Sequence, residues 1–301
     1  MDSGAHYFRT DFQIHTPRDP NWHGGDATSH SDRLAYARRF VELCRERALD
    51  AVAITDHHDM CLVSYVQAAS QNSEFDPEAD FEPLPGEQKP LVFPGMELTV
   101  RQGCQIIVLL DPKSGLNIQK LLLTTACGTT PECKASKGPV VQQLSFADPT
   151  ELDKRLRGTD LKDQYLLLPN VNDGGQHSWL RDGFTKIYSK MPCVGAYVDG
   201  SLEGHRRKHL LEGKDHNWGN KAVAVFQTSD FRGWGMVANQ VEKPNPADPT
   251  RRPLGSCITW VKLGDNTIEA VRQACLGRQS RIQQSESMSH CQLKVRWRLV
   301  V

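Results

Sequence analysis

Histidine, carboxylate and amide side chains recur at separate places along this 301-residue chain, each next to a short apolar segment. Solvated loops often hold such residues, so a single instance carries little information. Their recurrence favours a metal or phosphate site, because neutral imidazole and carboxylate together bind zinc, manganese or iron. The groups concerned are His15, Asp56 with His57, Glu97, Asn170, and Asp230 with Arg232.

Glu97 is the best candidate for a ligand shared by two ions, since it is the only acid in an otherwise apolar segment. A carboxylate can bridge two ions, and a bridged pair can generate hydroxide near neutral pH. His57 and His58 are adjacent, so their side chains point to opposite sides of an extended chain and only one is expected to contact an ion. The residues therefore predict a hydrolytic centre with one or two divalent ions of zinc, manganese or iron.

The apolar segments next to these residues are the strands expected to position them. Between several of the strands, apolar residues recur at the spacing of a helix face, which predicts helices there; one such set is Leu34, Ala37, Val41 and Cys44. Seven or eight short strands that alternate with helices predict a parallel sheet, and in such a sheet the chemistry lies beyond the carboxyl ends of the strands. The expected strands are 7–14, 51–54, 91–93, 105–110, 165–168, 194–197, 222–226 and 258–261.

Composition excludes some classes of protein. Lysine plus arginine and aspartate plus glutamate both total 36, which weakens the case for a broad basic face that binds nucleic acid. No apolar stretch approaches the roughly 20 residues that span a bilayer, and residues 1–10 lack the apolar core of a signal peptide. Nine cysteines, none in a C-x-x-C pair, indicate free thiols. We expect a cytoplasmic protein without membrane contacts.

The motifs resemble those of the PHP (polymerase and histidinol phosphatase) family of metal-dependent phosphoesterases, over about residues 7–281. The matching segments are Gln13-x-His15, Thr55-Asp56-His57, Gly95-x-Glu97 and Ser229-Asp230-x-Arg232. The resemblance implies an α/β fold, a distorted (β/α)7 barrel related to the TIM barrel, over residues 1–282. Residues 283–301 would be a tail or a truncated linker.

Two further segments, 11–17 and 260–262, are similar to a branch in which the PHP domain precedes an AAA- or SMC-like ATPase, as in TrlF-type proteins. This sequence contains no P-loop, so the resemblance implies a separate ATPase as a partner. The other expected partners are a phosphorylated small molecule or a nucleic-acid end.

The resemblance also assigns roles to individual residues. Four family histidines are replaced, by Gln13, Gln105, Asn170 and Arg232. Amide oxygens are weak zinc ligands, and a guanidinium attracts phosphate rather than metal. The implied metal ligands are His15, His57, Glu97 and Asp230, with Gln13 and His23 as further candidates. The implied catalytic residues are Asp56, His57 and Arg232, and the implied substrate-binding residues are Arg18, Arg232 and Asn170.

These residues support two main hypotheses. The first is an enzyme that hydrolyses a phosphoester with a metal-bound hydroxide as nucleophile, while Arg232 or Arg18 neutralises charge in the transition state. The second is a degenerate PHP domain that binds a phosphorylated ligand or an ATPase without turnover. A metal-dependent amidohydrolase is a further alternative, although it usually needs a different motif order. Metal content would separate the first two hypotheses, since only the first requires bound ions.

Overall fold

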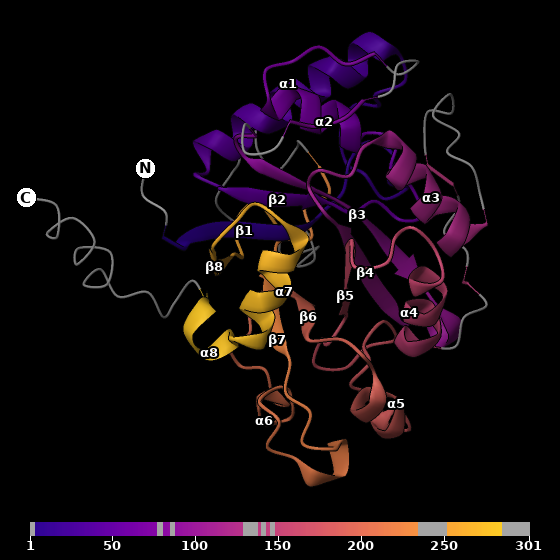
Figure 1. Cartoon of the computed structure of the whole chain (residues 1–301), viewed down its shortest axis with the longest axis vertical. Coiled ribbons are helices and arrows are strands. Elements are labelled where there is room, and N and C mark those ends of the chain that lie inside the picture. The colour runs from indigo at the N-terminus through magenta and orange to yellow at the C-terminus, as the bar shows by residue number, and fades with distance from the viewer. Residues whose placement is uncertain are drawn as a thin grey trace, which may run out of the picture.

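Strands in two sheets form the centre of the molecule (Figure 1). The computed structural model describes residues 4–76, 81–84, 88–128, 138–139, 143–144, 148–233 and 252–284. In this part of the chain, one sheet has seven strands in the order β5-β4-β3-β2-β1-β8-β9, and the other pairs β6 with β7. The strands are β1 (His6–Ile14), β2 (Ala51–Ile54), β3 (Leu91–Thr99), β4 (Gln105–Leu110), β5 (Tyr165–Pro169), β6 (Gly195–Asp199), β7 (Ala224–Thr228), β8 (Thr259–Leu263) and β9 (Ile282–Gln284).

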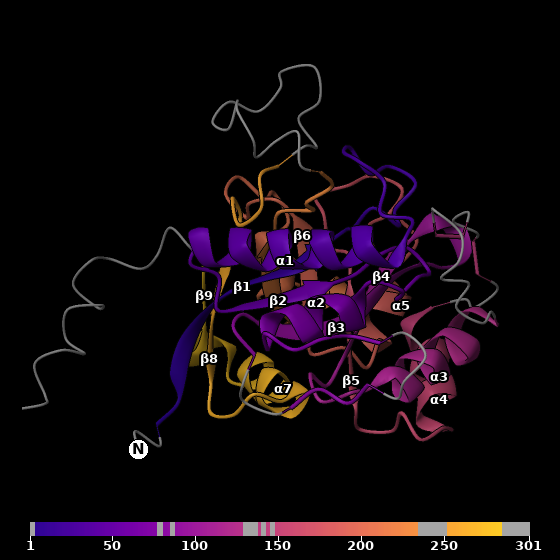
Figure 2. The same ribbon diagram turned by 90° about the horizontal axis from the view of Figure 1, so that it is seen from above.

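In the described part of the chain, helices pack around the strands. Figure 2 shows α1 and α7 on opposite sides of β1 and β2. The α-helices are α1 (His30–Glu46), α2 (Val63–Ser70), α3 (Leu116–Cys127), α4 (Pro149–Arg157), α5 (Thr185–Lys190), α6 (Lys208–Leu211), α7 (Ile268–Leu276) and α8 (Arg278–Arg281); the 3-10 helices are η1 (Arg101–Gly103) and η2 (His216–Trp218). No helix among them has the length and apolar character needed to cross a membrane.

The strand directions correct the predicted all-parallel sheet. β1, β2 and β3 are parallel, as expected, but β3, β4 and β5 form an antiparallel run and β8 is antiparallel to β1. Only η1 connects β3 to β4, and a parallel pair needs a crossover of a dozen or more residues. The fold of the described residues is therefore mixed α/β with a curled sheet, consistent with a barrel-related architecture, and the predicted count of seven β/α units is not confirmed.

The two sheets meet at the carboxyl ends of their strands. Asn170, after β5, forms a bridge with Tyr197 of β6, and the Val171 amide donates to the Tyr197 carbonyl at 2.8 Å. On the other side, Ile14 at the end of β1 bridges Phe231, and the His15 amide donates to the Phe231 carbonyl at 2.9 Å. The strand ends that carry the predicted site are therefore tied into one rim.

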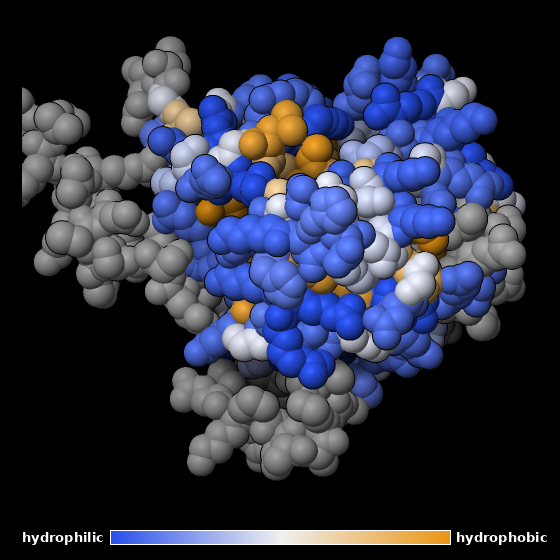
Figure 3. Space-filling model, turned by 90° about the horizontal axis from the view of Figure 1, so that it is seen from below, coloured by the Kyte–Doolittle hydropathy of each residue, from blue (hydrophilic) through white to orange (hydrophobic). Residues whose placement is uncertain are grey.

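Buried apolar residues form an outer and an inner cluster, since successive side chains of a strand face opposite sides. The outer cluster joins the sheet to α1 and α2, whereas the inner one lies between the strands and is closed by Ile268, Val271 and Ala274 of α7. The face seen from below is mainly hydrophilic, with hydrophobic residues in small separate groups (Figure 3). Apolar side chains therefore pack in the interior, and polar groups are left at the rim.

Two further predictions concern the chain end and the cysteines. β9 contains residues 283 and 284 of the predicted tail, and Gln283 pairs with Trp260 of β8; residues 285–301 lie outside the described part. The seven cysteines that the structure describes are free thiols, as expected.

Candidate metal centre

The carboxyl-end rim brings together residues that are far apart in the sequence. His15 follows β1, His57 follows β2, and Asp230 and Arg232 follow β7. Glu97 lies inside β3 rather than after it, because β3 continues through Pro94 and Gly95 to Thr99. These five functional side chains form one buried cluster, so their predicted convergence is observed.

Two local features of the strands make this convergence possible. In β1, Phe12 and Gln13 both stand opposite Ala53, which is a β-bulge. As a result Phe12 packs in the inner cluster while the next residue, Gln13, also reaches the interior. At Gly95, a side-chain carbon would lie 2.8 Å from Cγ2 of Thr55, so only glycine lets β3 pass this close to the end of β2.

His15 lies at the centre of the cluster. Its Nδ1 is 2.7 Å from Oδ2 of Asp19, and its Nε2 is 3.2 Å from Oδ1 of Asp230 and 3.5 Å from Oε2 of Glu97. Nε2 of His57 is 3.4 Å from the same Glu97 oxygen and 3.8 Å from Oδ2 of Asp19. One ligand atom from each of His15, Asp19 and His57 lies within 4.8 Å of the others, close enough to hold one ion.

Unpartnered buried atoms show that the cluster fits a cation. Nδ1 of His57 and Oε2 of Glu97 are buried and have no hydrogen-bond partner among the described residues. Such atoms are rare in proteins, because an unsatisfied buried polar group costs about 1–3 kcal/mol. A mixed set of imidazoles and carboxylates is also the donor set that zinc, manganese or iron prefers. His15, Asp19 and His57 would hold the ion, with Glu97 beside them.

Burial and neighbouring charge shift the pKa values in the cluster. Burial lowers the pKa of His57 to about 3, so this imidazole is neutral and ready to bind metal. Burial and Arg232 lower the pKa of His15, but Asp19 and Asp230 outweigh them and raise it to about 10. Burial raises the pKa of Glu97 to about 7, although His15 and Arg232 oppose this. Without a metal, protonated His15 and Arg232 supply the positive charge that the acids need.

Arg232 faces the cluster and contacts Asp230, as its position in the motif predicts. Its Nη2 is 2.8 Å from Oδ1 of Asp230 and 3.9 Å from Oε2 of Glu97, while Nη1 is 3.3 Å from Oδ2 of Asp19. Asp230 has a φ of 50°, a left-handed conformation that turns the chain back toward the rim. The Arg232 side chain is 17% exposed and so reaches the solvent side of the cluster.

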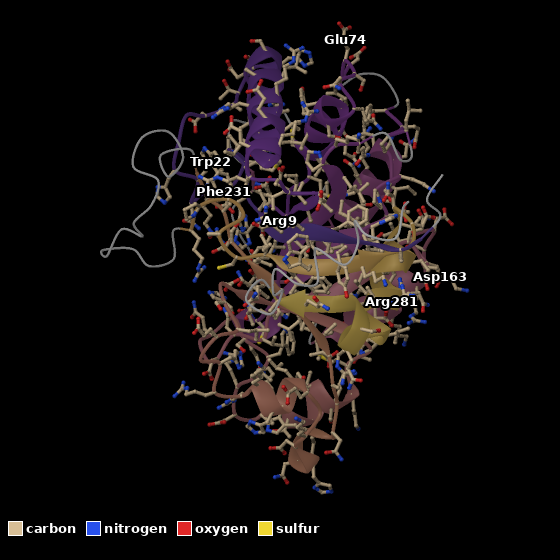
Figure 4. The ribbon with its side chains drawn as sticks, turned by 90° about the vertical axis from the view of Figure 1, so that its left-hand side faces the viewer. Arg9, Trp22, Glu74, Asp163, Phe231 and Arg281 are labelled. Atoms are coloured by element: carbon tan, nitrogen blue, oxygen red, sulfur yellow. The ribbon has the colours of Figure 1, made fainter. Side chains whose placement is uncertain are left out.

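Aromatic packing fixes the segment that carries Asp230 and Arg232. Phe231, between them, is fully buried, and its ring centroid is 5.7 Å from that of Trp22 in an edge-to-face arrangement. Figure 4 shows these two residues side by side. Because Phe231 packs in the outer apolar cluster, its two charged neighbours, Asp230 and Arg232, are held at the cluster around His15.

Gln13, a predicted metal ligand, is engaged in hydrogen bonds. Its Nε2 donates to Oε1 of Glu97 at 3.3 Å, and its Oε1 accepts from the Thr228 hydroxyl at 2.6 Å. The hydroxyl of Tyr197 donates to the same Glu97 oxygen at 2.5 Å. Two donors therefore hold Oε1 and leave Oε2 directed at the imidazoles.

Asp56 lies at the edge of the cluster, with its Oδ1 3.9 Å from Nδ1 of His15, whereas His23, Arg18 and Asn170 are placed around the cluster. The carboxylate of Asp56 accepts from the amide and the hydroxyl of Thr16, at 2.7 and 2.6 Å, and thereby fixes the backbone that follows His15. The His23 amide donates to the Arg232 carbonyl at 2.7 Å. The third residue that lies close enough to His15 and His57 to hold an ion with them is Asp19 rather than His23.

Two predicted substrate-binding residues also have protein partners. Arg18 is buried, and its Nη2 forms an ion pair of 2.7 Å with Oδ2 of Asp59. Nδ2 of Asn170 donates to Oδ2 of Asp199 at 3.3 Å, and its Oδ1 accepts from the Asn172 amide at 3.0 Å. Of the residues expected to bind substrate, Arg232 alone contacts the cluster acids through ion pairs in the described part.

The sequence analysis missed Asp19 and Tyr197. Asp19 comes four residues after His15 in a Pro-rich turn, whose geometry is fixed by a 2.9 Å hydrogen bond from the Asp19 amide to the Thr16 carbonyl. An acid four residues after a candidate ligand was the available signal. Tyr197 lies inside an apolar run and so resembles a core residue; only its hydroxyl, which needs a partner when buried, pointed to the site.

Comparisons with known proteins place the fold. No family model and no curated protein matches the sequence. The structure is similar to Endonuclease Q in complex with a 27-mer duplex substrate with an abasic lesion at the active site, and to the lesion-specific endonuclease PfuEndoQ from Pyrococcus furiosus. Both have a TM-score of 0.54 and 14% identity.

The similarity covers most of this chain but little more than half of each endonuclease. It covers 92% and 93% of the chain and 58% of the endonuclease chain in both cases. An amidohydrolase from Chromobacterium violaceum, with bound sulfate and no metal, has a TM-score of 0.45 at 14% identity and covers 91% of this chain and 97% of its own. The likeness to the endonucleases shows a shared fold.

Proposed function

We propose that this protein is a phosphoesterase that depends on a divalent metal ion. The observation that carries the proposal is Oε2 of Glu97, which accepts no hydrogen bond from the described residues and lies 3.4–3.5 Å from imidazole nitrogens of His15 and His57 in a buried acid cluster. A zinc, manganese or iron ion bound by His15, Asp19 and His57 would supply a Lewis acid and lower the pKa of a bound water.

Arg232 is the residue proposed to neutralise substrate charge. Its guanidinium carries five N–H donors, stays charged, and is held at the solvent side of the cluster by Asp230 and Asp19. A fixed cation beside the reacting phosphoryl group stabilises the charge that develops in the transition state. Asp56 is proposed as a positioning residue, since both of its oxygens bind Thr16.

The proposed substrate is a phosphoester, either in a nucleic-acid strand or in a phosphorylated small molecule. The shared fold with Endonuclease Q, whose structure contains duplex DNA, supports the nucleic-acid choice. The formal net charge of zero favours a local contact, such as a strand end, over a long basic groove. A separate ATPase partner stays a prediction.

The test is hydrolysis by chelator-treated protein after addition of Mn²⁺, Zn²⁺ or Fe²⁺. The substrates are bis(4-nitrophenyl) phosphate, 4-nitrophenyl phosphate and an end-labelled oligonucleotide. Glu97→Gln should lower kcat/KM by at least about 100-fold, because the imidazoles lose their shared carboxylate. The matched control is Glu74→Gln, an exposed residue far from Trp22 and Phe231 in Figure 4, and it should keep full activity.

Two results would contradict the proposal. Equal turnover by Glu97→Gln would assign the activity to another site. Metal and phosphate binding without turnover of any of these substrates would favour the non-catalytic alternative, a domain that binds a phosphorylated ligand.

A further inference from the structure

We infer that the centre holds a single divalent ion, because Gln13 and Tyr197 cover one oxygen of Glu97 while Arg232 provides the remaining positive charge. The inference rests on the metal centre of the proposed function and specifies how many ions it takes. It also revises the role expected for Glu97, from a bridge between two ions to a carboxylate that offers one oxygen.

The first argument is that Oε1 of Glu97 is saturated. A carboxylate oxygen has two lone pairs, and Oε1 accepts from the Tyr197 hydroxyl at 2.5 Å and from Nε2 of Gln13 at 3.3 Å. Neither donor can move away easily. The ring of Tyr197 is fully buried in the inner cluster, and the amide of Gln13 is held at its other end by Thr228.

The second argument is that the guanidinium of Arg232 lies beside the open oxygen. Oε2 faces His15 and His57 on one side and Nη2 of Arg232, at 3.9 Å, on the other. An ion bridged through Oε2 would have to lie next to this guanidinium. Nη1 of the same guanidinium is 3.3 Å from Oδ2 of Asp19, so a first ion is already repelled by this charge, and a second ion would add its repulsion from the first.

The third argument is the balance of charge. Three carboxylates contact both His15 and Arg232, namely those of Asp19, Glu97 and Asp230. When ionised they carry three negative charges, which one divalent ion and one guanidinium neutralise if both imidazoles are neutral ligands. A second divalent ion would have to draw on Asp56 and Asp199, the other acids nearby; both oxygens of Asp56 already accept from Thr16, and Oδ2 of Asp199 accepts from Asn170 and Asn172.

The amide of Asn170 supplies the fourth argument. The resemblance implies a family histidine at this position, and the amide that replaces it could bind an ion only through its oxygen. That oxygen already accepts from the Asn172 amide at 3.0 Å, and the nitrogen donates to Asp199. Asn170 therefore closes this position with bonds to its neighbours.

The experiment counts ions and needs no activity measurement. Chelator-treated full-length protein is titrated with Mn²⁺ by calorimetry, and bound Mn²⁺ is examined by electron paramagnetic resonance. The wild type should bind one ion per chain, with the spectrum of an isolated Mn²⁺. The quadruple variant Gln13→His, Asn170→His, Tyr197→Phe, Arg232→His removes the four obstacles and should bind a second ion, magnetically coupled to the first. Arg281→His, far from Phe231 in Figure 4, is the control and should stay at one.

Each outcome decides the question. Two coupled ions in the wild type, or a folded quadruple variant that still binds one, would overturn the inference. If the quadruple variant fails to fold, the wild-type count decides alone. A wild type that binds one ion but hydrolyses no phosphoester would contradict the proposed function and support this inference. A wild type that binds two ions and hydrolyses a phosphoester would support the proposed function and contradict this inference. Absence of binding contradicts both.

Discussion

Nδ1 of His15 lies 2.7 Å from Oδ2 of Asp19, only four residues later in the chain. The same Asp19 oxygen is 3.8 Å from Nε2 of His57 and 3.3 Å from Nη1 of Arg232. These contacts with three cationic or titratable groups hold the pKa of the buried Asp19 carboxyl well below its usual range, although burial itself raises it. Asp19 is therefore an ionised carboxylate that contacts both imidazoles.

The first prediction is that Asp19→Asn weakens Mn²⁺ binding by about 10- to 100-fold, since the amide keeps the shape but removes the charge and most of the donor strength. Calorimetric titration of chelator-treated protein measures the change. Asp163→Asn is the matched control: it is exposed, and its φ of 66° suits asparagine as well as aspartate. Figure 4 shows Asp163 well away from Trp22 and Phe231. If both variants bind equally well, Asp19 has only a structural role.

Much of the fold was accessible from the sequence. Short apolar runs marked the strands, and the recurrence of polar residues after them predicted that His15, His57 and Asp230 would converge. The sheet directions were harder, because an apolar run shows burial and not orientation. The short connection from Thr99 to Gln105 was the one sign that β3 and β4 are antiparallel.

The candidate site was less accessible than the fold. Glu97 was found because an acid in an apolar segment is unusual, but its single open oxygen depends on Tyr197, which is 100 residues away in the sequence. Arg18 has the charge expected of a phosphate ligand, yet Asp59 binds it within the protein. Side-chain chemistry can be read from a sequence, but the choice of partner is made by tertiary packing.

The second prediction is that metal binding stabilises the fold. An ion at 100 times its dissociation constant adds about 2.7 kcal/mol to the free energy of unfolding, if it binds only the native state. Urea denaturation with and without Mn²⁺ measures this gain. Glu74→Gln should show the full gain and Glu97→Gln much less. A similar gain in both variants would place the bound ion outside this cluster.

The third prediction concerns the pH dependence of stability in the metal-free protein. Asp11 is fully buried and accepts from the hydroxyl and the amide of Ser229, at 2.5 and 3.1 Å, so it anchors the segment that leads to Asp230. Burial raises the pKa of Asp11 to about 6, although its hydrogen bonds oppose this. The native state thus holds this proton more tightly than the unfolded state does.

The sign of the pH effect follows from proton linkage. Between about pH 4 and 6 the native state binds more protons at Asp11, so this group's contribution to stability decreases as the pH rises. Asp11→Asn removes the titration. The free energy of unfolding of this variant, relative to wild type, should therefore increase from pH 4 to pH 7. An opposite trend for Asp11→Asn would show that its carboxyl is not protonated in the native state.

The fourth prediction links the apolar interior to the metal centre. Phe12 is 1% exposed, and its ring centroid lies 5.2 Å from that of Phe93 and 5.3 Å from that of Phe226, so these three rings pack together in the inner apolar cluster. Phe12→Ala should lower the free energy of unfolding by about 3–5 kcal/mol, because it removes buried surface and leaves a cavity. Urea denaturation measures this loss, and Leu276→Ala, at a residue 58% exposed, should cost far less.

Since Gln13 follows Phe12 in the bulge and holds Glu97, the Phe12→Ala variant should also bind Mn²⁺ more weakly. Phe12→Leu refills most of the cavity and should recover both the free energy of unfolding and the affinity for Mn²⁺. Recovery of stability alone would show that the packing of the three rings and the metal centre are independent.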